Sequence, residues 1–197
     1  MGDKINIVLT GVGGQGVITA ANILGKAAVN AKVNVYASEV HGMAQRGGSV
    51  SCTVRMGKIF GPLIASGTAD AIISMEPSEA LRYIQYANKK TKVVTDINPV
   101  IPFTVAVGGE KYPGLDDIFN EINSRSKLYK INALKIAIES GALITKNIVM
   151  LGALVATDVL PFKSEILLKT ILDNVPAKHK EINKRAFWGG MKAIKKS

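Results

Sequence analysis

Cysteine and histidine are scarce in this sequence. Cys52 is the only cysteine among 197 residues, and His41 and His179 are the only histidines. A single thiol excludes a disulfide framework, and it also excludes a zinc or iron–sulfur site built from several cysteines of this chain. The two histidines are too far apart in the sequence to suggest a metal pair. We therefore expect no metal site in this chain, and any redox centre would belong to another polypeptide.

Motifs for common cofactors and for targeting are also missing. The sequence has no G-x-x-x-x-G-K-[ST] phosphate loop, and no G-D-G segment that leads to ligands of magnesium and thiamine diphosphate. No apolar run reaches the roughly 18 residues of a membrane span, and the first residues lack the basic region and apolar core of a signal peptide. We expect a soluble, cytoplasmic protein with no membrane partner.

The composition is that of a folded, basic protein. Hydrophobic residues make up 47% of the chain, which is ample for the core of one sizeable domain. The net charge of +10 attracts acidic or phosphorylated partners, although a solvated lysine-rich surface accounts for it as well. Aromatic residues are only 6% and no nucleic-acid-binding motif is present, so we expect no nucleic-acid partner.

Strand patterns alternate with helix patterns over the first two thirds of the chain. The predicted strands span residues 4–10, 33–40, 49–56, 69–76, 91–98 and a short stretch near 128–133; the predicted helices begin at Val17 and Pro77 and lie near 115–126 and 134–141. A hairpin turn is predicted at 56–58. From Lys146 onward the pattern is wholly helical.

This alternation indicates an α/β fold. We expect a doubly wound, mostly parallel, Rossmann-like sheet in residues 1–145 and a helical C-terminal extension in residues 146–197. Together they would form a single domain that spans residues 1–197.

The segment GVGGQG joins the first predicted strand to the first predicted helix and contains the pattern G-x-G-x-x-G. Its candidate ligand-binding residues are Gly11, Gly13, Gly14, Gln15 and Gly16. Free N–H groups and the helix dipole favour an anion at such a turn. A dinucleotide site normally has an acidic residue about 20 positions further on, where this chain has Tyr36. The alternatives are NAD binding, a phosphate or pyrophosphate contact, and a glycine-rich turn needed only for packing.

A second polar and glycine-rich loop, EVHGMAQRGGSV, occupies residues 39–50. Its candidate partner or cleft contacts are Glu39, His41, Met43, Gln45, Arg46, Gly47, Gly48 and Ser49. Arg46 has a planar guanidinium that suits a carboxylate or a phosphate, or else pairs with Glu39. Histidine titrates near neutrality, so His41 is a candidate acid or base, or else hydrogen-bonds a neighbouring backbone group. His41 and Arg46 are therefore the two catalytic candidates.

The position of this second loop also points to a site. It follows a predicted strand and should lie at the carboxyl end of the sheet, where open α/β sheets bind ligands. The alternating strand that comes next would present Ser49, Ser51, Thr53 and Arg55 to a partner or to solvent.

Together the two loops are similar to a known family. GVGGQG opening the helix VITAANILGKAA, followed by SEVHGMAQRGGSVSCTVRMG, resembles the gamma-type catalytic domain of the 2-oxoacid:ferredoxin oxidoreductases. The segments NIVMLGALVA (147–156) and EINKRAFWGG (181–190) extend the resemblance over most of the chain. Val12 and the residues around GMAQ depart from the pyruvate branch. The resemblance is therefore greatest to the small beta subunit of the indolepyruvate (aryl-pyruvate) branch.

The resemblance implies a subunit that is not active alone. In the family, partner chains or domains carry thiamine diphosphate, magnesium and iron–sulfur clusters; a 2-oxoacid is oxidatively decarboxylated, electrons pass to ferredoxin, and the acyl group leaves on coenzyme A. We therefore expect no cofactor bound by this chain alone, and a larger thiamine- and iron–sulfur-bearing partner. We also expect the glycine loop and Arg46 to contact coenzyme A phosphates. A homodimer of the isolated chain would cover a bare interface, and a free-standing nucleotide-binding protein or dehydrogenase is the alternative.

Overall fold

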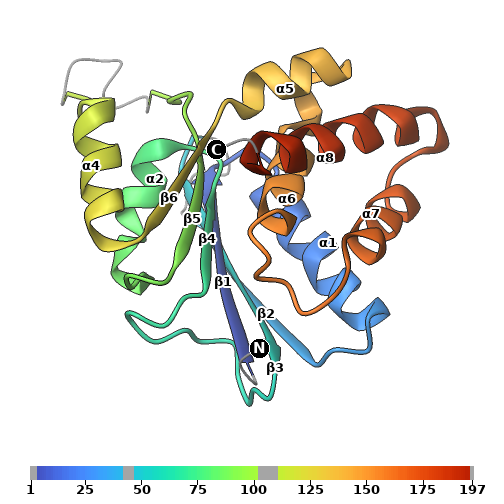
Figure 1. Cartoon of the computed structure of the whole chain (residues 1–197), viewed down its shortest axis with the longest axis horizontal. Helices are drawn as coiled ribbons and strands as arrows, with labels where there is room; N and C mark the ends of the chain where they lie inside the picture. The colour runs from blue at the N-terminus through green and yellow to red at the C-terminus, as the bar shows by residue number, and fades with distance from the viewer. Residues whose placement is uncertain (1–3, 42–46, 102–110, 196–197) are drawn as a thin grey trace.

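Six strands form one sheet at the centre of the structure, a computed structural model that describes residues 4–41, 47–101 and 111–195 (Figure 1). The strands are β1 (Lys4–Val12), β2 (Val35–His41), β3 (Ser49–Gly57), β4 (Ala71–Ser74), β5 (Lys92–Asp96) and β6 (Lys127–Ile131), in the order β2-β3-β1-β4-β5-β6. β1 lies inside the sheet, and all its residues after Lys4 are buried. Its continuous apolar run is the pattern expected of a strand covered on both faces.

The sheet is mixed. β1, β4, β5 and β6 are parallel neighbours, as the predicted α/β fold requires. β3 runs antiparallel to β1, and β2 runs antiparallel to β3. Residues 42–48 are too few for a parallel crossover, which needs a dozen or more residues, so β2 and β3 pair in opposite directions.

Helices cover both faces of the sheet (Figure 1). They are α1 (Val17–Asn30), α2 (Pro77–Arg82), α4 (Leu115–Arg125), α5 (Ala133–Ser140), α6 (Lys146–Val155), α7 (Ser164–Asp173) and α8 (Lys180–Lys195), with short 3-10 turns η1 (Ile84–Tyr86), η2 (Leu143–Thr145) and η3 (Ala177–His179). α2 and α4 cover one face and enclose a small buried cluster. α1, α6, α7 and α8 cover the other face and enclose a larger one.

The C-terminal helices pack directly on the sheet, and α6 and α8 approach each other very closely. A Cβ atom on Gly152 would lie 2.0 Å from the carbonyl oxygen of Phe187, and one on Gly190 would lie 1.9 Å from that of Val149. Only glycine fits at either position. α6 is buried along most of its length, and its apolar residues belong to the same cluster as Leu9 of β1.

The segment after β3 differs from the prediction. Residues 58–70 form an irregular loop instead of the second strand of a hairpin. This loop covers the polar side of β3: Arg55 donates hydrogen bonds of 2.7 Å to the carbonyl oxygens of Gly61 and Leu63, and the Thr53 hydroxyl donates to another loop carbonyl at 3.0 Å. The expectation that this face meets a partner or solvent is therefore wrong for Ser51, which is buried, whereas Thr53 and Arg55 bond to their own chain and stay partly exposed.

The helix predicted from Pro77 is shorter than expected. Pro77 does occupy the first turn, as predicted, but α2 ends at Arg82 and only the 3-10 turn η1 continues it.

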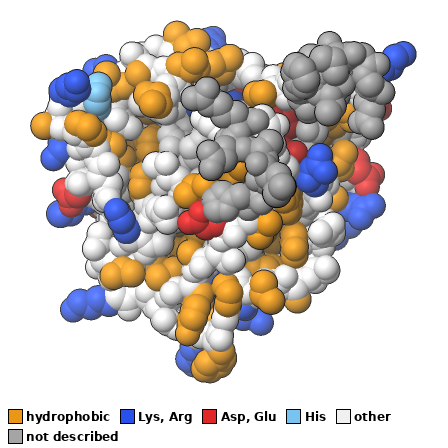
Figure 2. Space-filling model, turned by 180° about the vertical axis from the view of Figure 1, so that it is seen from behind, with side chains coloured by type: hydrophobic (Ala, Val, Ile, Leu, Met, Phe, Trp, Pro, Cys, Tyr) orange, Lys and Arg blue, Asp and Glu red, His pale blue; other side chains and the backbone are white. Residues whose placement is uncertain are grey.

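Basic side chains lie at the surface, beside exposed hydrophobic ones (Figure 2). Lysine and arginine side chains are scattered around the rim of the face shown in Figure 2. Among the residues that the structure describes, no helix has the length and apolar character needed to cross a bilayer.

Candidate functional site

The two glycine-rich loops singled out in the sequence meet at the carboxyl end of the sheet. Val12, the last residue of β1, pairs with Ser49, the first residue of β3. One step further on, the Gly13 backbone N–H donates to the Gly48 carbonyl oxygen at 2.8 Å. The end of the loop between β2 and β3 therefore lies beside the glycine loop, at the edge of the sheet where it was expected.

The glycines of the first loop serve different purposes. Gly14 and Gly16 adopt left-handed φ angles of 98° and 77°, which a tight turn before α1 requires. Gly11 lies within β1, where an added Cβ would come within 2.9 Å of Met75 and 3.0 Å of Val17. Gly11 is thus needed for close packing and leaves no room for a ligand, whereas the turn at Gly14–Gly16 faces a cavity.

Gln15 joins two strand ends. Its Oε1 accepts from the Val12 N–H at 2.8 Å, and its Nε2 donates to the Met75 carbonyl at 3.2 Å. The side-chain amide therefore bridges the end of β1 to the residue after β4.

Asp96 and Lys146 form a buried ion pair beside this turn. Asp96 ends β5 and is fully buried, and Lys146 begins α6 with only 14% of its side chain exposed. The Lys146 ammonium also donates to the Met75 carbonyl at 3.0 Å, while Oδ1 of Asp96 accepts from the Ala133 N–H at 3.1 Å. One ion pair thus fixes the ends of β4 and β5 to the starts of α5 and α6.

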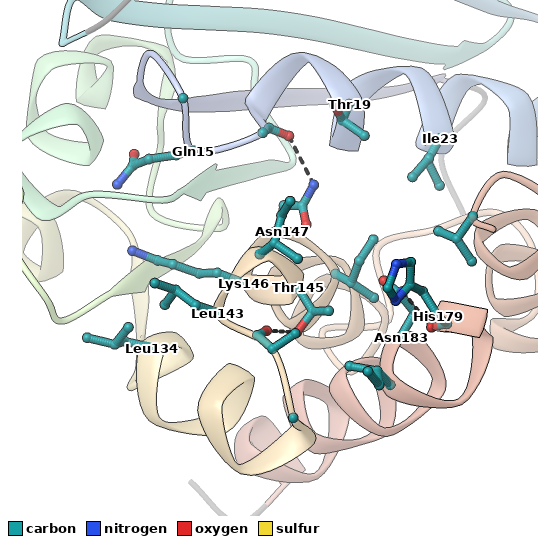
Figure 3. Close-up of a pocket in the computed structure, with 18 of the residues that line it drawn as sticks. Gln15, Thr19, Ile23, Leu134, Leu143, Thr145, Lys146, Asn147, His179 and Asn183 are labelled. Carbon is teal, nitrogen blue, oxygen red and sulfur yellow. Dashed lines mark hydrogen bonds between the residues drawn. The ribbon is translucent and has the colours of Figure 1, made fainter. Parts of the chain in front are cut away.

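The N-termini of α1 and α6 face each other across this point. Asn147, in the first turn of α6, donates from Nδ2 to the Gly16 carbonyl at 3.4 Å (Figure 3). A Cβ atom on Gly16 would lie 2.7 Å from that nitrogen. No side chain caps either helix, and both helices direct the positive ends of their dipoles toward one edge of the sheet. At α6 the Lys146 N–H already donates to the Leu143 carbonyl of η2.

A cavity of about 1130 Å³ opens beside these helix ends (Figure 3). Its walls come from the glycine turn, the segment after β5, the α5–α6 connection, and the chain from α7 to α8; they include Gly14, Thr19, Ile23, Val100, Leu134, Lys146, Asn147, His179 and Asn183. Leu143 and Ile144 of η2 also line it and are 58% and 87% exposed. The cavity combines an apolar lining with a few polar groups, which is the usual character of a ligand pocket.

Glu76 organises a second polar cluster at the same end of the sheet. This carboxylate is fully buried; its Oε2 accepts from the Glu79 N–H at 3.0 Å and so caps α2. Its Oε1 accepts from the Val100 N–H at 3.4 Å and from the hydroxyl of Tyr112. Burial, followed by the hydrogen bond to Glu76, raises the pKa of Tyr112 above its ordinary range.

Side chains on β2 and β3 take part in one hydrogen bond and one electrostatic interaction near the predicted loop. The Ser49 hydroxyl donates to a carboxylate oxygen of Glu79 at 2.5 Å. Glu39 lies opposite Cys52 in the β2–β3 register. Burial, and to a smaller extent the charge of Glu39, raises the pKa of the Cys52 thiol to about 11, so this thiol is uncharged at neutral pH.

Part of the predicted site lies outside the described residues. Met43, Gln45 and Arg46 belong to residues 42–46, and for His41 only the backbone position at the end of β2 is described. The roles suggested for them stay predictions. In the described ranges, no group of three or more His, Cys, Asp or Glu side chains is placed to hold a metal ion.

The sequence interpretation missed Glu76, Asp96 and Lys146. The signal for the two acids was present, because Asp96 ends a buried apolar strand and Glu76 lies two residues after the end of another, at the edge where ligands bind. Lys146 was visible as the charged residue that opens an apolar helix. The pairing of Asp96 with Lys146 could not be predicted, because the two residues are far apart in the sequence and meet only in the folded chain.

Comparison with known proteins gives consistent matches. A family model for pyruvate ferredoxin/flavodoxin oxidoreductase matches residues 6–193. Indolepyruvate oxidoreductase subunit IorB of Pyrococcus horikoshii is 45% identical over 195 residues, which cover 98% of this chain and 96% of that protein.

Solved structures share the fold. The gamma subunit of a keto/oxoacid ferredoxin oxidoreductase from Geobacter sulfurreducens has a TM-score of 0.72 and 26% identity, covering 98% of this chain and 99% of that one. A 2-oxoglutarate:ferredoxin oxidoreductase from Magnetococcus marinus, with 2-oxoglutarate, coenzyme A and succinyl-CoA bound, has a TM-score of 0.76 and 22% identity. The match covers 100% of this chain and 32% of that longer chain.

Proposed function

Because the chain belongs to the pyruvate ferredoxin/flavodoxin oxidoreductase family, we propose that it is the small subunit of a 2-oxoacid:ferredoxin oxidoreductase of the indolepyruvate type. The main support is the 45% identity to the Pyrococcus horikoshii IorB subunit over nearly the full length of both chains. Similarity of that extent includes both loops of the candidate site and the C-terminal helices. The chain would work in a complex with a larger subunit.

The proposed reaction oxidises a 2-oxoacid at its carboxylate end. The 2-oxoacid and coenzyme A give an acyl-CoA, carbon dioxide and a proton, and the two electrons released reduce two molecules of oxidised ferredoxin. Thiamine diphosphate supplies the carbanion-stabilising chemistry of such a decarboxylation. This chain does not fit a resident cluster, because its one cysteine is buried inside the sheet. The partner subunit would therefore hold the thiamine, magnesium and iron–sulfur groups.

The part of this chain that would serve the reaction is the carboxyl end of the sheet. The cavity beside the glycine turn has uncapped helix N-termini in its wall, which favour an anionic group such as a coenzyme A phosphate. Gly14 and Gly16 remain the members of the glycine loop best placed for that contact, since Gly11 and Gln15 serve packing and bridging. The Asp96–Lys146 pair would hold the wall of the cavity in place.

Co-expression with the large subunit from the same source tests the function. The assay is the reduction of ferredoxin by indolepyruvate, pyruvate or 2-oxoglutarate in the presence of coenzyme A. We expect the assembled complex to reduce ferredoxin fastest with indolepyruvate, and the isolated chain to show no turnover. Turnover by the isolated chain, or its binding of NAD, would favour a free-standing dehydrogenase instead.

The coenzyme A contact needs its own test in the assembled complex. We expect Arg46→Ala to raise the KM for coenzyme A with little change in the KM for the 2-oxoacid. Arg125→Ala is the matched control, because Arg125 pairs with Glu121 on the exposed side of α4. An unchanged coenzyme A KM in Arg46→Ala would remove that residue from the proposal.

A further inference from the structure

β2 is the end strand of the sheet, and among the described strands it pairs with β3 alone. Tyr36 is 41% exposed and Val40 is 64% exposed. Ala37 and Glu39, which lie between them, are exposed as well. The strand VYASEVH contains neither proline nor lysine, two residues that commonly block pairing at a sheet edge. Such an open edge is a template on which another strand can pair.

Every second residue of β2 directs its backbone groups outward. The Gly57 N–H donates to the Asn34 carbonyl at 2.9 Å, just before β2 begins. Hydrogen-bonded and non-hydrogen-bonded positions alternate along an antiparallel pair, so every second residue from Tyr36 to Val40 bonds to β3. The residues that turn their N–H and C=O groups away from β3 are Val35, Ala37, Glu39 and His41.

A second copy of β2 fits this edge in one antiparallel register. A two-fold axis at Ser38 would place Ala37 opposite Glu39 of the second copy in hydrogen-bonded pairs. It would also place Tyr36 opposite Val40 in the closer, non-hydrogen-bonded pairs. Aromatic and β-branched residues make favourable cross-strand pairs, so both exposed apolar side chains would find a partner. An axis at Glu39 would instead place two like charges opposite each other, and an axis at Ala37 would place Tyr36 opposite Ser38.

A groove beside β2 supplies a matching charge. It has a volume of about 580 Å³ and lies between α1 and β2, and both Lys26 and Ala37 line it. Residues directly opposite each other in a strand pair have their side chains on the same face of the sheet. Glu39 of the second copy, opposite Ala37, would therefore lie near Lys26, and the two-fold axis repeats this contact. Asp173, the acidic residue in the groove wall, has its own cation in Lys169 at 2.7 Å.

We propose that this chain forms a homodimer through β2, in which two six-stranded sheets join into one across a two-fold axis. The inference goes beyond the proposed function and does not rest on it, because both halves of the contact belong to this chain. A strand of a different protein could use the same backbone groups. The pairing of Tyr36 with Val40, and of Glu39 with Lys26, favours a second β2 because each side chain has its complement on the same chain.

Sedimentation equilibrium of the full chain, from micromolar to millimolar concentration, measures the dissociation constant of the dimer. We expect Val40→Lys to raise this constant at least about tenfold, since a charge would replace an apolar cross-strand contact. Ala37→Pro should do the same, because it removes an outward N–H and no bond to β3. Ile138→Lys is the matched control, because Ile138 is 60% exposed on α5. Thermal melts should show that all three variants are folded.

Further variants test the register. Ser38→Cys should give a disulfide-linked dimer under mild oxidation, because the axis places the two copies of this residue opposite each other, within the Cα separation that a disulfide spans. Ala37→Cys is the control and should not cross-link, since it lies opposite Glu39. Cys52 is buried and should stay reduced. Glu39→Lys and Lys26→Glu should each weaken the dimer, and the variant with both changes should restore it.

Each outcome has a distinct meaning. A wild-type chain that stays monomeric at millimolar concentration would overturn the dimer and leave the proposed function standing. A dimer whose affinity is unchanged in Val40→Lys and Ala37→Pro, or that does not cross-link in Ser38→Cys, would overturn it as well. If the wild type is monomeric and Val40→Lys weakens its binding to the large subunit of the proposed complex, the edge belongs to that partner and self-pairing is refuted.

Discussion

Replacing Lys146 with methionine should destabilise the protein more than any other loss of a lysine charge in the described chain. The substitution keeps most of the side-chain volume but leaves the carboxylate of Asp96 buried without its cation. Removing one partner of a buried pair costs about 3–5 kcal/mol. Lys146 is 14% exposed, and Asp96 keeps hydrogen bonds from Asn98 and Ala133. We therefore expect a decrease in the free energy of unfolding at the lower end of this range, about 3 kcal/mol. Urea denaturation of the isolated chain measures this difference.

Two comparisons isolate the ion pair as the cause. Lys169→Met removes the cation of an exposed pair with Asp173, and its free energy of unfolding should stay within error of the wild type. Adding Asp96→Asn to Lys146→Met removes both buried charges. The free energy of unfolding of the double variant should therefore fall by less than the sum of the decreases in the two single variants. If Lys146→Met were no less stable than Lys169→Met, the carboxyl end of the sheet would not depend on this pair.

Three further predictions concern helix packing, the thiol and the buried phenol. Gly190→Ala should lower the free energy of unfolding by at least about 2 kcal/mol, since the new methyl would lie 1.9 Å from a backbone oxygen. Gly25→Ala is the control: its methyl meets nothing within 4 Å, so it should raise the free energy of unfolding by about 0.5–1 kcal/mol. Thermal melts of both variants measure the difference. Cys52, with its pKa raised to about 11, should resist iodoacetamide at pH 8 until the chain unfolds. The free energy of unfolding should fall as pH rises from the ordinary thiol pKa of 9.0 toward 11, because the unfolded chain loses the thiol proton first. Tyr112→Phe should cost about 1–3 kcal/mol in urea denaturation, because it removes a donor from the buried Glu76 carboxylate.

The local order of strands and helices could be predicted from the sequence. The apolar run before the glycine turn, the helical spacing from Val17 and the proline at the start of α2 each depend on neighbouring residues, and the structure confirms them. The carboxyl-edge position of the second loop also followed from the pattern. These features are encoded within a few residues of where they occur.

Features that depend on distant contacts were not predictable in this way. The alternation in residues 49–56 correctly gave a strand with one apolar and one polar face, but it gave no information about what covers the polar face. That cover comes from the hydrogen bonds of Arg55 to its own loop. The ion pair of Asp96 with Lys146 likewise depends on how β5 and α6 meet.

The glycine motif illustrates what such a pattern specifies. Gly11 is required by packing against Met75, and Gly16 by a left-handed turn against Asn147. Both requirements follow from placing α1 tightly against the end of β1, and neither involves a ligand. The pattern therefore predicts a strand–turn–helix geometry and an exposed helix N-terminus, which a nucleotide-binding protein and an oxidoreductase subunit can share. The chemistry must be decided by residues that reach the cavity from other elements.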